Sequence, residues 1–159
     1  MSVDLDSNLD LDFAPIAKRI RESVGQQGFM THIGAELSEL ARGSCTLVVD
    51  RRRELLQQHG LFHGGVTAFL VDNATTIAAA TSRGQPALTA EYKLNLLSPA
   101  AGERLIYRAR VIKPGRQVAV VAADVFCVID GIEKHTATAL ASIAMLTGEV
   151  SAKIPSPAW

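Results

Sequence analysis

The sequence predicts an α+β fold in which an antiparallel sheet wraps around one long central helix, with a short helix before it. Two observations carry this prediction. Residues 63–82 are a mostly apolar stretch of helical length, and the chain after Pro86 has the composition and alternation of β-strands. The 159 residues fit one domain with its own core, expected over residues 13–148, between an arm at 1–12 and a tail at 149–159.

The N-terminal third is expected to hold an arm, one helix and one strand. Residues 1–12 alternate Asp and Leu, and we interpret them as a flexible arm. From Pro15, apolar residues recur at every fourth position until Gly25, which predicts a short amphipathic helix with proline near its first turn. Ser44–Asp50 is a short apolar run that predicts a strand.

Four strands joined by tight turns are expected after the long helix. Period-two alternation and β-rich composition predict them, and the Pro114-Gly115 and Asp130-Gly131 dipeptides mark two hairpin turns. The run that begins at Arg116 is nearly all apolar, as in a central strand. The predicted strands are 88–97, 104–111, 116–129 and 135–146.

Composition excludes several classes of protein. The 16 basic and 16 acidic side chains cancel, so no net charge draws the chain to nucleic acid or a membrane surface. No apolar run is long enough for a membrane span, and the acidic N-terminus does not resemble a signal peptide. Cys45 and Cys127 lie far apart and fit small core residues in a reducing compartment, so we expect a cytoplasmic protein.

The stretch HGGVTAFLVDNATTIAAA, which starts at His63, holds the chemistry of interest. Gly64 and Gly65 at the helix start offer backbone N–H groups without intrahelical partners, which suit an oxygen that gains negative charge. Asp72 is the one carboxylate in this stretch. Burial of a bare carboxylate is costly, so we expect it either to favour its protonated form or to have hydrogen-bond partners. Thr75 and Thr76, on the same helix face, could supply those hydrogen bonds.

Helix geometry separates the two ends of this motif. Nine residues at ~1.5 Å rise place Asp72 roughly 13 Å beyond His63, and nine steps of ~100° place it on the opposite side of the helix. One copy of the helix therefore cannot bring both to one substrate atom. If both act in one reaction, Asp72 comes from a second copy, which predicts a dimer with two equivalent sites at its interface.

Simpler interpretations of the same residues stay open. Asp72 could be a satisfied polar group or face a polar interface, and His63 could be only a turn or helix-capping residue. His59 and His63 have the i, i+4 spacing of a metal pair, but no third ligand is apparent, so no metal site is predicted. Arg51, Arg52 and Arg53 fit a solvated strand end.

The chain resembles the PaaI-like acyl-CoA thioesterases of the hotdog-fold superfamily. The segments that carry the resemblance are GLFHGGVTAFLVDNATTIAA, the Ser98-Pro99 dipeptide and PGRQVAVVAADVF from Pro114. It extends over roughly residues 33–147, most of the chain. The resemblance implies a hotdog fold, in which an antiparallel sheet wraps around a long helix. It also implies dimers that join two sheets edge to edge, that often pair into tetramers, and that hold their active sites between subunits.

The resemblance implies a role for three residues of the motif. Asp72 matches the catalytic acid, which acts as general base on water or as nucleophile on the thioester. Gly64 matches the residue whose backbone N–H polarises the thioester carbonyl. His63 matches a histidine thought to orient this segment or to bind near the thiol leaving group.

Three further residues match family positions less closely. Gln57 stands where relatives carry Asn or Gln to position the carbonyl or the water, and its arm is longer than that of the commoner Asn. Thr89 aligns, after a one-residue gap, with a Ser or Thr that helps to hold the water. Thr76 stands where some relatives have a Thr beside the acid.

The implied substrate is an acyl-CoA, and the hydrolysis requires neither a metal nor a further cofactor. The acyl group could be aryl or medium-chain aliphatic, in a pocket formed by residues such as Leu61, Phe62, Phe69 and the alanines at 78–80. Cations in predicted loops are candidates for the coenzyme A phosphates, and these are Arg83, Lys113 and Arg116.

Two other functions fit the same fold. A hotdog hydratase or dehydratase pairs a histidine with an acid at a different spacing from His63 and Asp72. A non-catalytic acyl-CoA-binding regulator would need a basic DNA-reading segment, whereas the N-terminal segment Asp4–Asp12 is acidic. We therefore expect an acyl-CoA thioesterase that binds no nucleic acid and no membrane.

Overall fold

The structure is a computed structural model that describes residues 5–146, with side chains from Phe13 onward. Six strands and three α-helices make up this part of the chain, together with a short 3-10 helix, η1. In chain order they are α1 Leu5–Gly25, α2 Gly28–Ile33, β1 Ala35–Ala41, β2 Ser44–Asp50, η1 Arg53–Leu55, α3 Gly64–Arg83, β3 Ala87–Leu96, β4 Arg104–Lys113, β5 Val118–Ile129 and β6 Ile132–Met145.

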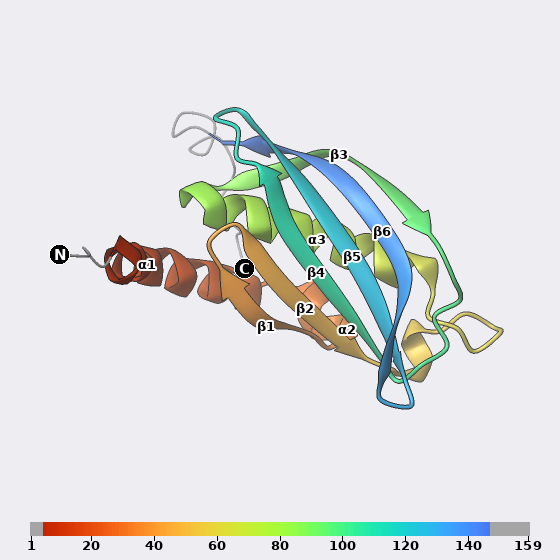
Figure 1. Cartoon of the computed structure of the whole chain (residues 1–159). Coiled ribbons are helices and arrows are strands. Elements are labelled where there is room, and N and C mark those ends of the chain that lie inside the picture. Colours follow the sequence, from red (N-terminus) through yellow and green to blue (C-terminus); the bar gives the residue numbers. More distant parts are fainter. Residues whose placement is uncertain (1–4, 147–159) are drawn as a thin grey trace.

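The six strands form one antiparallel sheet in the order β1-β2-β4-β5-β6-β3. Figure 1 shows this sheet curving across one side of α3, so the predicted fold class is confirmed. β5, predicted as a central strand, lies between β4 and β6. β3 pairs only with β6 and forms one edge of the sheet.

α3 packs on the sheet through small side chains. Ala74, Ala78 and Ala79 are fully buried against the strands, where their size allows the helix to approach the sheet closely. Ala78 and Ala79 therefore belong to the core, and their predicted place in an acyl pocket is wrong. α3 is not covered on every side, because Asp72 and Thr76 lie on a stripe of the helix that is only partly buried.

α1 begins earlier than the sequence pattern indicates. Residues 5–12, expected as part of an arm, are helical, and Pro15 lies inside the helix rather than near its first turn. The apolar residues Leu5, Leu9 and Phe13 are four positions apart, a helical spacing that the alternation with Asp obscures.

Two elements that the sequence pattern does not predict, α2 and β1, lie between the first helix and the first predicted strand. β1 lies at the sheet edge opposite β3, pairs only with β2, and has an irregular register between Leu37 and Glu39. Its charged and partly exposed residues lack the apolar alternation that predicts a strand. α2 has six residues, too few for a periodic pattern.

The hairpins after α3 form as predicted. Asp130 and Gly131, between β5 and β6, both have positive φ, at 50° and 75°, as a two-residue type I′ turn requires. The predicted tail at 149–159 lies outside the described residues. Among the helices of the described region, none is long and apolar enough to cross a bilayer.

Gly102 precedes β4 in a place that has no room for a side chain. Its N–H donates to the Cys127 Sγ at 3.1 Å, and a Cβ added there would overlap the carbonyl oxygen of Val128. We expect Gly102→Ala to lower the free energy of unfolding by roughly 1–3 kcal/mol, since overpacking forces the backbone apart. Urea unfolding measures this change.

Gly25→Ala is the matched control, because a Cβ at Gly25 meets nothing within 4 Å. Within a helix, alanine in place of glycine is expected to add about 0.5–1 kcal/mol. Equal urea midpoints for the two variants would contradict the steric explanation for Gly102.

Candidate active site

A histidine caps the start of α3. His63 has extended backbone angles, and its Nδ1 accepts a hydrogen bond of 2.9 Å from the N–H of Gly65. Because Nδ1 is an acceptor here, the neutral imidazole carries its proton on Nε2. The segment that leads into the helix is fixed by the backbone, since the N–H of His63 donates to the Leu55 carbonyl at 2.8 Å.

The cap leaves one amide of the first turn available. The N–H of Gly65 is taken by His63 Nδ1, and that of Val66 donates to the His63 carbonyl at 2.9 Å. Within residues 5–146, no acceptor faces the N–H of Gly64. A free donor at the positive end of a 20-residue helix is suited to a developing negative charge.

Gly64 lines a cavity of about 330 Å³ in which further polar groups are free. The amide of Gln57 and the hydroxyl of Thr67 also line it, and in the described part of the chain neither side chain has a hydrogen-bond partner. The hydroxyls of Ser98 and Thr136, by contrast, donate to backbone carbonyls. The cavity therefore holds three polar groups without partners among the described residues near the helix start, and it brings the predicted site residues Gln57 and Gly64 together.

The remaining walls of this cavity are apolar. They come from the segment before α3, from the end of β3 and the loop that follows it, and from β6. Leu96 and Leu97 are 62% and 51% exposed, unusual values for large apolar side chains beside a cavity. The apolar lining residues are Leu61, Phe62, Leu96, Leu97, Pro99, Ala100 and Ala137.

Asp72, Thr76 and Thr89 form a second cluster. The hydroxyls of Thr76 and Thr89 lie 2.8 Å apart, which joins the middle of α3 to β3. Asp72 precedes Thr76 by one helical turn on the same partly covered stripe. In the described region the Asp72 carboxylate has no hydrogen-bond or ion-pair partner. Thr75, a predicted partner of this carboxylate, instead donates to the Val71 carbonyl at 2.9 Å.

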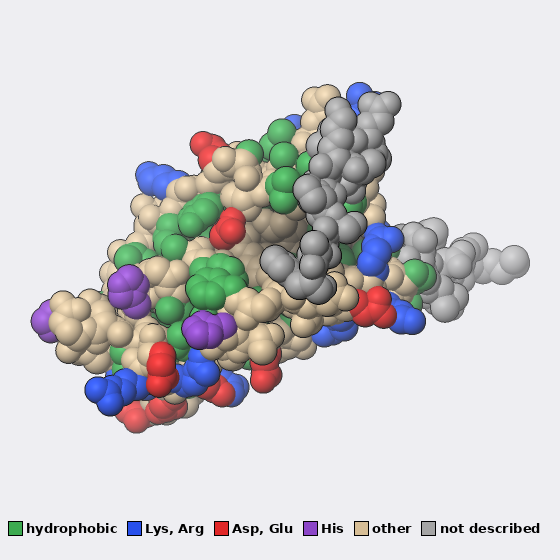
Figure 2. Space-filling view, turned by 180° about the vertical axis from the view of Figure 1, so that it is seen from behind, with side chains coloured by type: hydrophobic (Ala, Val, Ile, Leu, Met, Phe, Trp, Pro, Cys, Tyr) green, Lys and Arg blue, Asp and Glu red, His purple; other side chains and the backbone are tan. Residues whose placement is uncertain are grey.

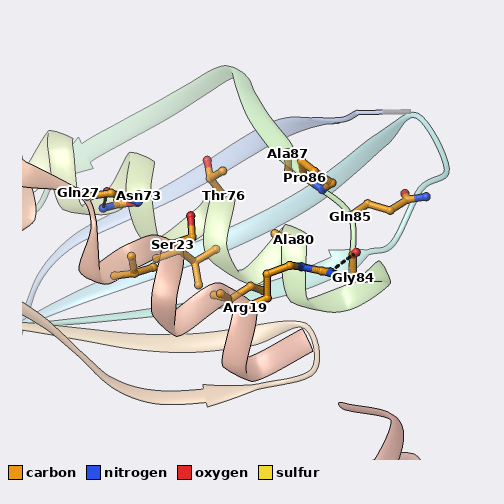
Figure 3. Close-up of a pocket in the computed structure, with 13 residues that line it drawn as sticks. Arg19, Ser23, Gln27, Asn73, Thr76, Ala80, Gly84, Gln85, Pro86 and Ala87 are labelled. Atoms are coloured by element: carbon orange, nitrogen blue, oxygen red, sulfur yellow. Dashed lines mark hydrogen bonds between the residues drawn. The ribbon is translucent and has the colours of Figure 1, made fainter. Parts of the chain in front are cut away.

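The two clusters are apart within one protomer. Asp72 follows Gly64 by eight residues, so the rise along the helix alone is roughly 12 Å. Gln57 and Gly64 line one cavity, whereas Thr76 lines another, of about 290 Å³, between α1, α3 and the start of β3 (Figure 3). One protomer therefore does not present all the predicted catalytic groups to a single ligand atom.

α1 closes the cavity that Thr76 lines. The amide of Asn73 donates to the side chain of Gln27 at 2.8 Å, and Arg19 donates to the Gly84 carbonyl at 2.7 Å, as Figure 3 shows. These two hydrogen bonds hold the end of α1 and the segment after it against α3.

A third cavity, of about 620 Å³, lies on the other side of the helix start. Its aromatic residues are Phe29 and Phe69, whose rings meet edge to face with centroids 4.4 Å apart. His63 and Gly65 line this cavity as well, so it adjoins the cap. On the face of the molecule that Figure 2 shows, hydrophobic side chains lie near the middle and Lys and Arg side chains lie mainly at the periphery.

The three predicted coenzyme A contacts lie at the far end of α3. Arg83 is the last residue of the helix, Lys113 ends β4 and Arg116 lies in the turn that follows, and all three are exposed. Arg83 follows Gly64 by 19 residues, or roughly 28 Å along the helix. Within one protomer these cations do not adjoin the Gly64 cavity.

Both cysteines lie in the core. Cys45 and Cys127 are free and buried, and burial raises the pKa of the Cys45 thiol to about 12. The thiol is therefore protonated at neutral pH and unreactive, as predicted for a small core residue.

Comparisons with known proteins show which family the chain is similar to. A family model described as "Thioesterase superfamily" matches residues 59–133. The human acyl-coenzyme A thioesterase 13 is 40% identical over 67 residues, which span 41% of this chain and 48% of that protein. A candidate esterase from Saccharolobus solfataricus is 30% identical over 122 residues, which span 76% of this chain and 79% of that protein.

Solved structures share the fold over most of the chain. A thioesterase family protein from Silicibacter pomeroyi superposes with a TM-score of 0.81 at 37% identity, over 84% of this chain and 99% of that one. The PaaI protein of Escherichia coli has a TM-score of 0.74 over 84% and 94% of the two chains, and at 19% identity it supports the fold alone.

The fold is the hotdog fold of thioesterases. The chain belongs to the thioesterase superfamily, since two of these relatives are at least 30% identical and matched over more than two thirds of their length. The alignment spans about half the length of the human relative.

The two glycines at the helix start differ in what a side chain would meet. A Cβ at Gly65 would lie 2.9 Å from His63 Nδ1, whereas one at Gly64 would lie 3.5 Å from the Leu96 Cδ1, an ordinary contact. We expect Gly65→Ala to displace the His63 ring and to lower the free energy of unfolding by about 1 kcal/mol, the value of a lost helix cap. Gly64→Ala should change it much less.

The double variant His63→Ala/Gly65→Ala tests this explanation in the same urea titrations. With the imidazole absent, the second substitution should cost no further stability. Additive losses from the two substitutions would show that Gly65→Ala acts on something other than the cap.

Proposed function

We propose that the protein is an acyl-CoA thioesterase, which hydrolyses an acyl-CoA to a free acid and coenzyme A. The observation that carries this proposal is the free N–H of Gly64 beside the Gln57 amide in one cavity. Asp72, on the same helix, has a carboxylate that no group in residues 5–146 engages. A carbonyl-polarising donor and an uncommitted carboxylate are the two groups that thioester hydrolysis requires.

In this mechanism the thioester carbonyl oxygen accepts a hydrogen bond from the N–H of Gly64, with Gln57 positioning the carbonyl or the water. Asp72 takes a proton from the water, whose oxygen bonds to the carbonyl carbon, and Gly64 stabilises the resulting oxyanion. The carbonyl then re-forms as the carbon–sulfur bond breaks, and the departing thiolate receives the proton that Asp72 took from the water. In the alternative mechanism the Asp72 carboxylate bonds to the carbonyl carbon and displaces the thiolate, and water then hydrolyses the resulting anhydride to the free acid and the Asp72 carboxylate. Thr76 and Thr89 hold the water beside Asp72.

The groups of one active site come from two protomers in this proposal. β3 is an edge strand with unpaired backbone groups and exposed Leu88, Tyr92 and Leu96, which favours pairing with a second copy. The start of α3 lies beside the end of β3, because Gly64 adjoins Leu96. The middle of α3 lies beside the start of β3, because Thr76 contacts Thr89.

Antiparallel pairing of two β3 edges therefore brings the Thr89 end of one copy to the Leu96 end of the other. Asp72 of one protomer then approaches Gly64 of its partner. Two such dimers can pair further into a tetramer, as in the family that the chain resembles.

We also assign a binding place to each part of the substrate. The acyl group, aryl or medium-chain aliphatic, lies in the apolar cavity of Phe29 and Phe69 next to the helix start. Arg83, Lys113 and Arg116 of the partner copy bind the coenzyme A phosphates. The free thiols of the core fit a cytoplasmic enzyme.

Release of free thiol from a panel of aryl- and alkyl-CoA substrates tests this function. We expect turnover by the unaltered chain and a ~10²–10⁴-fold lower kcat for Asp72→Asn, since the amide cannot accept the proton of the water. The half-exposed position of Asp72 should leave the urea midpoint nearly unchanged.

Two results would contradict the proposal. Tight binding of acyl-CoA without thiol release would indicate a binding protein, and hydration of an enoyl-CoA with the thioester intact would indicate a hydratase. Full activity of Asp72→Asn would refute the assigned role of the carboxylate.

A further inference from the structure

One hydroxyl of α3 differs from all the others. Thr75, Thr81 and Ser82 each donate to a backbone carbonyl three or four residues earlier, at 2.7–2.9 Å, and Thr76 contacts a hydroxyl of β3. Thr67, in the first turn, makes no such hydrogen bond within the described residues, although carbonyls are available at the same offsets. The Thr67 hydroxyl is therefore available to bond to a ligand.

Thr67 is also one of the residues that line the Gly64 cavity. It is 5% exposed, so its hydroxyl is screened from bulk solvent. Thr67 follows Gly64 by three residues, which places both on one helix face. The Cβ of a helical residue tilts toward the helix N-terminus, so the side chain of Thr67 leans over the turn that contains Gly64. Both donors thus serve the same side of the cavity.

A second hydroxyl without a hydrogen bond, in residues 13–146, belongs to a residue that interacts with Thr67. The Oη of Tyr107, on β4, is the one fully buried side-chain oxygen or nitrogen in residues 13–146 without a hydrogen bond. Burial raises the pKa of the Tyr107 phenol, which therefore keeps its proton and acts as a donor. The Thr67 hydroxyl approaches closely enough to offset part of this rise, yet outside hydrogen-bond geometry. A buried hydroxyl without a partner is unfavourable and is rare in proteins.

We infer that Thr67 is a second donor to the thioester carbonyl and that Tyr107 is the residue that positions it. With the substrate bound, Tyr107 Oη donates to Thr67 Oγ1, and the proton of Thr67 points to the carbonyl oxygen beside the N–H of Gly64. No proton changes place between these groups. The two donors together stabilise the negative charge that the carbonyl oxygen gains when water bonds to the carbon, and this inference rests on the proposed function.

The comparison of Thr67→Val with Thr67→Ser tests the role of Thr67. Valine keeps the shape and removes the donor, so we expect kcat to fall ~10²–10³-fold, as for loss of one oxyanion donor, with KM nearly unchanged. Serine keeps the hydroxyl and should retain kcat within about tenfold, less than the loss expected for a missing donor. Thr75→Val removes a hydroxyl of the same helix that already has a partner, and its kcat should match the unaltered chain.

Tyr107→Phe tests the positioning role. We expect a lower kcat in the chain with Thr67 and no further loss when Thr67 is already valine, the non-additivity of groups that act as a unit. Loss of an unsatisfied hydroxyl should not lower the melting temperature. A variant with merely altered packing would change the melting temperature without this dependence on Thr67.

The outcomes of these experiments distinguish a failure of this inference from a failure of the proposed function. If the unaltered chain hydrolyses acyl-CoA and Thr67→Val does so equally well, the second donor is refuted and the function stands. Unchanged kcat in Tyr107→Phe refutes the positioning role alone. If the unaltered chain hydrolyses no acyl-CoA, the function and the inference fall together.

Discussion

The hydrogen bond from the Gly65 amide to the Nδ1 of His63 decides which donor at the start of α3 remains free. A helix start always leaves several N–H groups unpaired, and here the side chain and the carbonyl of His63 engage the second and third of them. The N–H of Gly64 is the one that faces a cavity without a partner. His63 therefore shapes the site even where it touches no substrate. Glycine at 65 is required for this cap because a Cβ would meet the imidazole.

The antiparallel packing of α3 on β3 links this cap to the rest of the proposed site. It separates the carbonyl-binding groups from Asp72 along a single helix, and it also places them at opposite ends of the same edge strand. An edge strand that pairs with its own copy reverses that order. One protomer cannot form a complete site because these groups are far apart. The same arrangement would allow two protomers to complete the site between them.

Much of the fold follows from local sequence, because α3, the hairpins and β2 depend on periodicity and turn residues. The start of α1 and the edge strand β1 do not, since their alternating acidic and polar residues hide the spacing of the apolar ones. Two predictions about α3 are wrong for different reasons. Ala78 and Ala79 are buried by tertiary packing on the sheet, whereas Thr75 makes a local hydrogen bond to the carbonyl of Val71 in its own helix.

Residues of the candidate site could be predicted only where the residue type and its position in the sequence indicate a chemical role. Gly64 and Gln57 fall in one cavity, and Thr89, placed by an alignment with a gap, contacts Thr76. Thr67 and Tyr107 could not be predicted from the sequence, because what sets them apart is the lack of a hydrogen bond, which only the structure shows. Nothing in the sequence marks Thr67 among the other hydroxyls of its helix, although its offset of three from Gly64 places both on one face.

The most direct test is complementation within a mixed dimer. Gln57→Ala and Asp72→Asn protomers with different affinity tags are expressed together, the mixed dimer is isolated, and thiol release is compared with that of each parent homodimer. The mixed dimer has one site with both substitutions and one site with neither. We predict about half of the unaltered activity, since one of two equivalent sites is intact. Activity no higher than that of the parents would contradict an active site shared between protomers.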